Sequence, residues 1–318
     1  MYYFDLRHNL KKVKSERKNT RRNKFIHSSK AGYHYITRTS HFSMHKQNVE
    51  ELEYTASANM PNWAEDNPEF FWNAADQYES MSKRTSTHIT IALPKELSKL
   101  KRVELSNQLI HEFCGKYKMP YSFAIHSHIA SIDDRYEQPH LHLLYCERSI
   151  FDGIERTPEK FFKKYCYKNP EKGGAKKITA DVLKLGRYQI SHYRKITEKV
   201  INNFLKLYAP VKEVEIYGIK IEVENKVSCL SNEDYNQKYG TNLQDVPQIP
   251  RHYFHSQDQE IQDKVHKFKT SIKKIRETNL YEIYKNEYHL ELSKKSEYQN
   301  ETTYTVEFEE SEENNFEC

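Results

Sequence analysis

The fold of this chain is decided by the stretch Gln138-Pro139-His140-Leu141-His142-Leu143-Leu144-Tyr145. Its apolar, β-prone residues predict a strand. Because side chains alternate between faces along a strand, His140 and His142 are expected to project to the same side, two positions apart.

A third histidine ends a second β-prone run just upstream, Tyr121-Ser122-Phe123-Ala124-Ile125-His126. A polar loop, residues 127–139, joins the two predicted strands. If they pair antiparallel, their three histidines meet at one place. Three imidazoles with open positions suit a divalent metal that acts on a substrate oxygen. The chain has 16 histidines, so the spacing alone fits scattered surface histidines as well.

Further motifs follow one another on both sides of these strands, over about residues 28 to 205. They are Met60-Pro61, Trp72-Asn73-Ala74-Ala75-Asp76, Ile91-Ala92-Leu93-Pro94-Lys95-Glu96-Leu97, Met119-Pro120-Tyr121, Pro139-His140-Leu141-His142, Glu147-Arg148, Asp152-Gly153-Ile154-Glu155-Arg156, Phe162-Lys163-Lys164-Tyr165 and Pro170-Glu171-Lys172-Gly173-Gly174-Ala175-Lys176-Lys177. This ordered set resembles the MobA/MobL family of plasmid mobilization relaxases. These are HUH-type single-strand endonucleases, named for a histidine–hydrophobe–histidine pair.

The order of predicted strands and helices is consistent with an α+β fold, an antiparallel sheet flanked by helices. The resemblance implies the HUH relaxase palm, whose central antiparallel sheet has five strands. It fades after about residue 209. We therefore expect a relaxase domain over residues 1–208. A small C-terminal extension, residues 209–318, is expected to hold a β-hairpin, a charged helix and an acidic tail.

The family needs a tyrosine nucleophile, and its motif registers on the segment Ser28-Ser29-Lys30-Ala31-Gly32-Tyr33-His34-Tyr35. The resemblance favours Tyr35, with Tyr33 as the second candidate. On a helix, residues two apart point about 200° away from each other, so only one of these tyrosines can face the metal.

The resemblance also implies the chemistry. His126, His140 and His142 would hold a divalent metal, Mn²⁺ or Mg²⁺, against the scissile phosphate. The tyrosine would attack to give a 5′-phosphotyrosyl enzyme and a free 3′-hydroxyl, and reversal would rejoin the strand. The expected function is a site-specific nick in one strand of a plasmid transfer origin.

Two positions depart from the family pattern, because His88 and Thr90 stand where the family often has acids. His88 could join the metal site, or Asp133, Asp134 and Glu137 could supply the acid. This departure motivates one alternative, a single-stranded DNA-binding protein of relaxase descent that no longer cuts. A rolling-circle replication initiator with the same chemistry is another alternative.

Basic residues near these motifs are candidates for contacts with DNA phosphates, although charge runs are usually solvated faces. The candidates are Lys30, Arg38, Arg148, Arg156, Lys163, Lys172, Lys176 and Lys177. The net charge of +5 is mild. The pair Gly173-Gly174 fits either the family motif or a simple flexible turn.

Five cysteines without a CxxC pair indicate neither a disulfide framework nor a zinc knuckle. No signal peptide and no apolar stretch of membrane-spanning length is recognisable. We therefore expect a cytoplasmic protein without membrane insertion. Its expected partners are single-stranded DNA at a transfer origin, accessory mobilization proteins and a type IV coupling protein.

Overall fold

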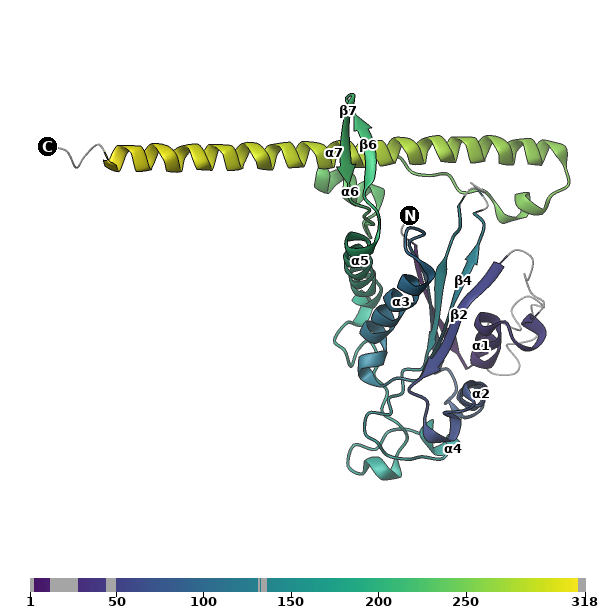
Figure 1. Ribbon diagram of the computed structural model, residues 1–318. Coiled ribbons are helices and arrows are strands. Elements are labelled where there is room, and N and C mark those ends of the chain that lie inside the picture. Colours follow the sequence, from purple (N-terminus) through teal and green to yellow (C-terminus); the bar gives the residue numbers. More distant parts are fainter. Residues whose placement is uncertain (1–2, 12–27, 44–49, 131, 133–135, 314–318) are drawn as a thin grey trace. The chain divides into compact units, whose positions relative to one another are not determined.

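The computed structural model describes residues 3–11, 28–43, 50–130, 132 and 136–313 (Figure 1). The chain divides into two compact units. The first comprises Met1–Pro210 with Asn225–Cys229, and the second comprises Val211–Glu224 with Leu230–Cys318. All histidines and tyrosines of the expected site lie in the first unit.

A central sheet organises the first unit, and the described residues contribute five strands to it. The strands are β1 (Phe4–Leu10), β2 (Glu50–Ala58), β3 (Arg84–Ala92), β4 (Tyr121–His128) and β5 (His140–Tyr145). They lie in the order β1-β3-β5-β4-β2, and each neighbouring pair is antiparallel. The expected α+β fold with a five-stranded antiparallel sheet is confirmed.

Helices pack against both faces of this sheet (Figure 1). One face carries α1 (Ser29–Thr37), α2 (Pro68–Tyr78) and the short α4 (Pro158–Phe161). The other carries α3 (Lys99–Phe113) and α5 (Gln189–Tyr208). Short 3-10 turns connect these elements: η2 (Ser40–Phe42), η3 (Asn62–Ala64), η4 (Gly115–Tyr117), η5 (Pro170–Lys172) and η6 (Gly186–Tyr188).

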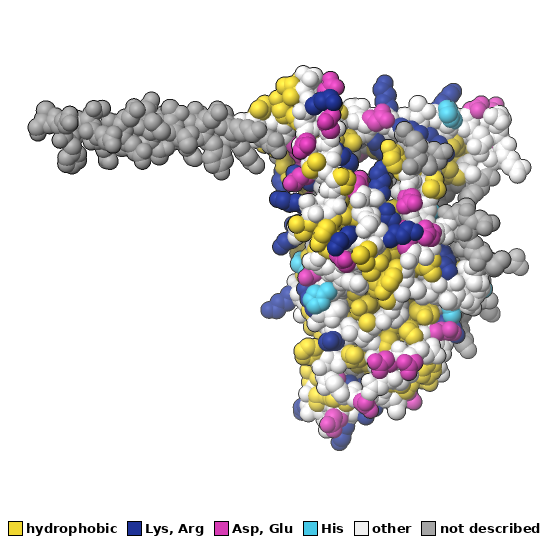
Figure 2. All heavy atoms as spheres, in the orientation of Figure 1, with side chains coloured by type: hydrophobic (Ala, Val, Ile, Leu, Met, Phe, Trp, Pro, Cys, Tyr) yellow, Lys and Arg dark blue, Asp and Glu magenta, His cyan; other side chains and the backbone are white. Residues whose placement is uncertain are grey.

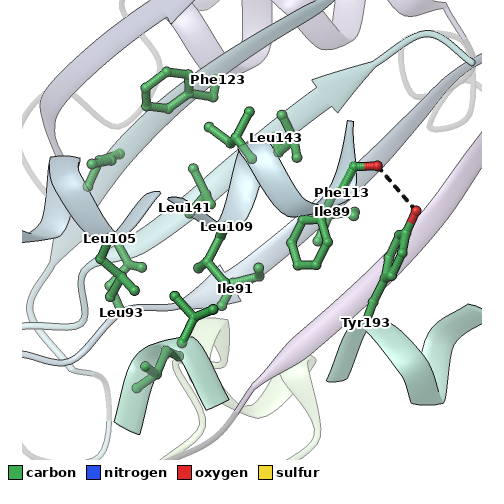
Figure 3. Packing of buried hydrophobic residues seen from close by; sticks show 14 of the residues in the cluster. Ile89, Ile91, Leu93, Leu105, Leu109, Phe113, Phe123, Leu141, Leu143 and Tyr193 are labelled. Atoms are coloured by element: carbon green, nitrogen blue, oxygen red, sulfur yellow. Dashed lines mark hydrogen bonds between the residues drawn. The ribbon is translucent and has the colours of Figure 1, made fainter. Parts of the chain in front are cut away.

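The main core lies between the sheet and the pair α3 and α5, as Figure 3 shows. Leu109 of α3 and Leu141 and Leu143 of β5 are fully buried there. The Tyr193 hydroxyl of α5 donates to the backbone carbonyl of Phe113 at 3.4 Å. Apolar side chains alternate with polar ones along β4 and β5, so the histidines point to the opposite face of the sheet, where α1 lies.

Strand β2 contains a β-bulge that changes which face its residues occupy. Leu52 pairs with His126, but the next paired residue is Tyr54, opposite Ile125, so Glu53 is extra in the ladder. Paired residues share a face, so Leu52 points to the α1 side with His126. Tyr54 points to the α3 side, where its ring packs 5.6 Å from that of Phe123. Bulges commonly re-aim side chains in this way.

The second unit contains a β-hairpin, β6 (Lys212–Ile216) paired with β7 (Ile219–Val223). Tyr217 and Gly218 form its turn with positive φ angles of 54° and 77°, as a two-residue hairpin loop requires. Helix α6 (Asn232–Tyr239), the turn η7 (Arg251–His255) and the long helix α7 (Gln259–Glu313) complete the unit. A search of the described residues finds no helix that combines the length and the apolarity needed to cross a membrane.

Candidate metal and nucleophile site

The three histidines of the expected site converge on the α1 face of the sheet. His126 on β4 lies directly opposite His140 on β5, and His142 follows two residues along β5. One ring nitrogen from each lies within 4.8 Å of the others, close enough for the three to hold one metal ion. The imidazole centroids of His140 and His142 are 4.8 Å apart, and those of His126 and His142 are 4.9 Å apart.

Each of these histidines is held by a hydrogen bond through its other ring nitrogen. His126 Nε2 donates to the carbonyl of Ile36 at 2.7 Å, and His140 Nδ1 donates to the carbonyl of Gln138 at 3.0 Å. Carbonyls accept only, so these bonds place the proton on the anchored nitrogen and leave His126 Nδ1 and His140 Nε2 with lone pairs. Metal-binding histidines are typically oriented by such bonds.

His142 is anchored by residues of β3. Its Nδ1 lies 3.1 Å from His88 Nε2 and 3.2 Å from the Thr90 hydroxyl. Its Nε2 is buried and has no hydrogen-bond partner among the described residues. A divalent metal bound between this nitrogen, His126 Nδ1 and His140 Nε2 would give His142 Nε2 a partner. The three histidines therefore fit the expected ion. His88 contacts the potential ligand His142. It is not itself one of the three histidines grouped as potential ligands.

Burial favours the neutral form of His142 and of its neighbour His88. It lowers the pKa of His142 well below its usual value, and the neighbouring His88, His140, His126 and Arg38 act in the same direction. Burial also lowers the pKa of His88 to about 4. The neutral form is the one that binds a metal.

The acid beside the histidines is Glu50, which the sequence analysis did not identify. It is buried at the start of β2. Its Oε1 lies 3.5 Å from His140 Nε2 and its Oε2 lies 3.8 Å from His126 Nδ1. Glu50, His128 and His140 form a second group that could hold a metal. Of the acids named as substitutes, Asp133 and Asp134 lie outside the described residues, and Glu137 lies 3.7 Å from Arg102.

Helix α1 carries the candidate nucleophiles and is fixed at both ends. At its start, the Asp76 carboxylate of α2 accepts from the Ser28 hydroxyl at 2.7 Å and from the amides of Ser29 and Lys30 at 2.8 and 3.0 Å. Near its end, the carbonyl of Ile36 accepts from His126. The last carbonyls of a helix have no partner within the helix, so this bond satisfies one of them.

Tyr35 lies beside the histidines, with its ring centroid 5.7 Å from that of His142 in an edge-to-face arrangement. Tyr33 lies beside His34, 5.8 Å between ring centroids. Burial raises the pKa of Tyr33, and the charge of Glu69 raises it further.

Arg38 lies between the candidate nucleophile Tyr35 and the candidate metal ligands. It caps α1 in the left-handed conformation, with φ 55°. Its guanidinium forms an ion pair with Glu50, lies 3.2 Å from His126 Nδ1, and lies 4.8 Å from the ring centroid of Tyr35. Burial lowers the pKa of Arg38, while the Tyr35 hydroxyl, through its charge and a side-chain hydrogen bond, acts to raise it. Arg38 therefore lies within the site.

Arg148 and Arg156 donate to groups inside the protein. Arg148 is buried, pairs with Glu79 at 2.9 and 3.0 Å, and donates to three backbone carbonyls. Arg156 pairs with Asp152 at 2.8 and 2.9 Å and donates to the carbonyls of Gly173, Ile154 and Pro170. Both guanidiniums hold the loop that follows β5 in place.

The lysines are more accessible. Lys163 and Lys172 are exposed, Lys176 is half-buried, and Lys177 lies 3.0 Å from Glu79. They follow the Tyr145 end of β5, away from His140, whereas Lys30 on α1 pairs with Glu69 at 2.8 Å. On the face drawn in Figure 2, Lys and Arg side chains lie interspersed with Asp and Glu.

Gly173 and Gly174 are required by close backbone contact. A Cβ on Gly174 would lie 2.0 Å from the carbonyl oxygen of Lys163, and one on Gly173 would lie 2.4 Å from the amide of Cys166. Neither position leaves room for a side chain, so the pair packs the loop tightly and is not a simple flexible turn.

Comparison with known proteins identifies the family of this chain. The model of the MobA/MobL family matches residues 20–222, and the chain belongs to this family. A 43 kDa relaxation protein of Salmonella typhimurium is 41% identical over 137 residues, which cover 43% of this chain and 36% of that protein. Mobilization protein A of Escherichia coli is 36% identical over 153 residues, covering 48% of this chain and 20% of that protein.

The matched part of the chain therefore spans about a third of the length of the relaxation protein and about a fifth of the length of Mobilization protein A. A solved structure described as "Molecular Basis of Vancomycin Resistance Transfer in Staphylococcus aureus" matches 65% of this chain and 93% of its own. Its sequence identity is 20% and its TM-score is 0.42, a likeness too distant to add to the argument.

Proposed function

We propose that this chain nicks one strand of a plasmid transfer origin and rejoins it after mobilization. The observation that carries the proposal is the convergence of three histidine ligand atoms within 4.8 Å, beside Tyr35, in a chain of the MobA/MobL family. The family supports a mobilization relaxase over a rolling-circle initiator. Glu50 supplies an acid at the site, which removes the main reason to favour a protein that no longer cuts.

Tyr35 is the proposed nucleophile. Its hydroxyl oxygen forms a bond to the scissile phosphorus as the bond from phosphorus to the 3′ oxygen breaks. The phenol loses its proton and the departing 3′ oxygen gains one. The products are a 5′-phosphotyrosyl enzyme and a free 3′-hydroxyl. One phosphodiester is exchanged for another, so the reverse reaction rejoins the strand without a nucleotide cofactor.

The surrounding side chains prepare this attack. The Arg38 guanidinium lies 4.8 Å from the centroid of the Tyr35 ring, which places a positive charge beside the proposed nucleophile. His126, His140 and His142 would hold Mn²⁺ or Mg²⁺, with His88 and Thr90 orienting His142. Such an ion, when bound, withdraws charge from a phosphate oxygen and orients the phosphorus.

The proposed substrate is single-stranded DNA at the transfer origin. Lys30, Lys163, Lys172, Lys176 and Lys177 are the proposed phosphate contacts, because their side chains are at least partly accessible, whereas those of Arg38, Arg148 and Arg156 are almost fully buried in ion pairs. Accessory mobilization proteins and a type IV coupling protein are the proposed partners in transfer.

The test is incubation with a 5′- and 3′-labelled single-stranded oligonucleotide library and Mn²⁺, with and without EDTA, read on a denaturing gel. We expect a metal-dependent protein–DNA adduct in the wild type and in Tyr33→Phe, and none in Tyr35→Phe, which removes only a hydroxyl. An adduct that persists in Tyr35→Phe but not in Tyr33→Phe would move the nucleophile to Tyr33. DNA binding without any adduct would replace the nicking function with a non-cutting one.

A further inference from the structure

We propose that Glu50 is a fourth protein ligand of the metal site, and that Arg38 competes with the metal for this carboxylate. The Arg38–Glu50 ion pair would then set how tightly the site binds a divalent cation. The inference rests on the histidine site proposed above.

The geometry places the carboxylate close to ligand spacing. Two donor atoms about 2.1 Å from a common ion lie about 3.0 to 3.5 Å apart in octahedral or tetrahedral coordination. Glu50 Oε1 lies 3.5 Å from His140 Nε2, at the upper end of this range, and Oε2 lies 3.8 Å from His126 Nδ1, just beyond it, so ligation requires only a small shift of the carboxylate. Both nitrogens are the ones left with lone pairs by the anchoring bonds.

The chemistry of a carboxylate suits the metal expected here. Imidazoles alone suit zinc and other borderline ions, whereas carboxylate oxygen suits Mg²⁺ and Mn²⁺. A carboxylate beside the three histidines would also offset part of the cation's charge in a buried site. Glu50 therefore gives the site the hard donor that the histidines lack.

Arg38 contacts the same atoms that a metal would use. Its guanidinium pairs with Glu50 and lies 3.2 Å from His126 Nδ1. The two side chains are 10% and 2% exposed, so solvent screens their charges little. Arginine does not lose its proton in proteins, so it yields the carboxylate to a cation only by moving. Its positive charge also repels the cation.

The competing interpretation is a purely structural ion pair that holds α1 against β2. Both interpretations predict that loss of Glu50 harms the site, but they differ for Arg38. Under the structural interpretation, removing either partner disorders the site and weakens metal binding. Under our proposal, removing Glu50 weakens binding and removing Arg38 strengthens it, so the two substitutions have opposite signs.

The strand offers a matched control, because a second buried pair joins β2 to α3. Glu53 lies 2.7 Å from Arg102, and the two side chains are 2% and 5% exposed. The Glu53 carboxylate pairs on the α3 side, away from the histidines. Glu53→Gln and Arg102→Gln therefore report what losing any buried pair of β2 does to the protein.

The experiment is calorimetric titration of the full, EDTA-treated chain with Mn²⁺. We expect Glu50→Gln to weaken Mn²⁺ binding about 10- to 100-fold, the range for loss of a group that supports a metal site. Arg38→Gln is expected to tighten binding about tenfold, and Arg38→Lys, which keeps the charge, to stay closer to the wild type. Glu53→Gln and Arg102→Gln are expected to leave the affinity unchanged.

Thermal unfolding in EDTA shows whether each variant folds. If Arg38→Gln does not fold, Arg38→Met is measured in its place. Weaker Mn²⁺ binding in folded Arg38 variants, or unchanged binding in Glu50→Gln, would overturn the inference. His142→Ala distinguishes a failure of the proposed histidine site from a failure of the proposed role of Glu50. If it binds Mn²⁺ as the wild type does, the histidine site itself is wrong. If it loses binding while Glu50→Gln does not, only the role of Glu50 fails.

Discussion

His126 Nε2 lies 2.7 Å from the backbone carbonyl oxygen of Ile36, the residue after Tyr35. One imidazole thus binds the end of the helix that carries the proposed nucleophile, and its other nitrogen faces the proposed metal site. A single hydrogen bond therefore positions both the proposed ligand and the helix of the proposed nucleophile.

His126→Ala should therefore destabilise the protein even without metal. It leaves the carbonyl of Ile36 buried and unpaired, at a cost of about 1 to 3 kcal/mol. His140→Ala is the control, because His140 bonds a carbonyl only two residues away and does not hold α1. Urea unfolding in EDTA measures both. Equal losses in the two variants would contradict a special role for the bond to Ile36.

Asp76→Ala should loosen the start of α1. The carboxylate accepts three hydrogen bonds there, and bonds to charged groups contribute about 1.5 to 3 kcal/mol each, though not additively. We expect a net loss of about 2 to 3 kcal/mol in the free energy of unfolding, with a smaller loss for Asp76→Asn. Ser28→Ala, which removes the cap and one of the three bonds to Asp76, should lose about 1 to 2 kcal/mol. An Asp76→Ala protein as stable as the wild type would contradict this account.

Gly174→Ala should destabilise by about 2 to 4 kcal/mol, because its Cβ would lie 2.0 Å from the Lys163 carbonyl and force the backbone apart. Gly32→Ala provides a control of opposite sign. Gly32 lies within α1, and its added Cβ would meet Leu144 at an ordinary 3.7 Å. Alanine is favoured over glycine in a helix by about 1 kcal/mol, so this variant should gain stability. Chemical unfolding of both variants measures the difference.

Arg148→Ala and Lys172→Ala should separate stability from DNA binding. Removing the buried Arg148 leaves Glu79 with Lys177 as its cationic partner and also removes three hydrogen bonds to backbone carbonyls, so it should lower the free energy of unfolding by about 3 kcal/mol. Lys172→Ala should leave stability unchanged. If Lys172 neutralises a phosphate, its loss should reduce the salt slope of single-stranded DNA binding by about 0.7. Fluorescence anisotropy across a salt series tests this, and an unchanged slope would exclude Lys172 as a contact.

The histidine strands could be predicted from sequence because both are local patterns. Alternation alone places His140 and His142 on one face, and antiparallel pairing across one loop brings His126 to them. Glu50 could not be found this way, because it precedes β4 by some seventy residues and reaches the site only through strand pairing. The bulge at Glu53 also breaks the even spacing of Leu52, Tyr54 and Ala56, so alternation would have assigned Glu50 to the wrong face.

The basic residues show a second limit of sequence reasoning. Arg148 and Lys172 belong to the same family-like run, and nothing in their residue type separates a buried cation from an exposed one. The distinction depends on Glu79, which comes from the segment after α2 and pairs with Arg148 only in the folded chain. The DNA contacts expected at Arg148 and Arg156 rested on their charge and on their position near the family motifs, neither of which predicts that both side chains hold a loop.

The bulge in β2 has a consequence for comparing relatives of different length. Two residues of this strand occupy one position in the ladder opposite β4, so a residue can be gained or lost there without shifting the pairs on either side. A relative without the extra residue would keep its acid at the position opposite His128. Every residue after the bulge would then stand one place earlier in its sequence. An ungapped alignment of this strand would then pair Glu50 with a neighbour of the true counterpart, and the acid would look absent where it is only displaced by one.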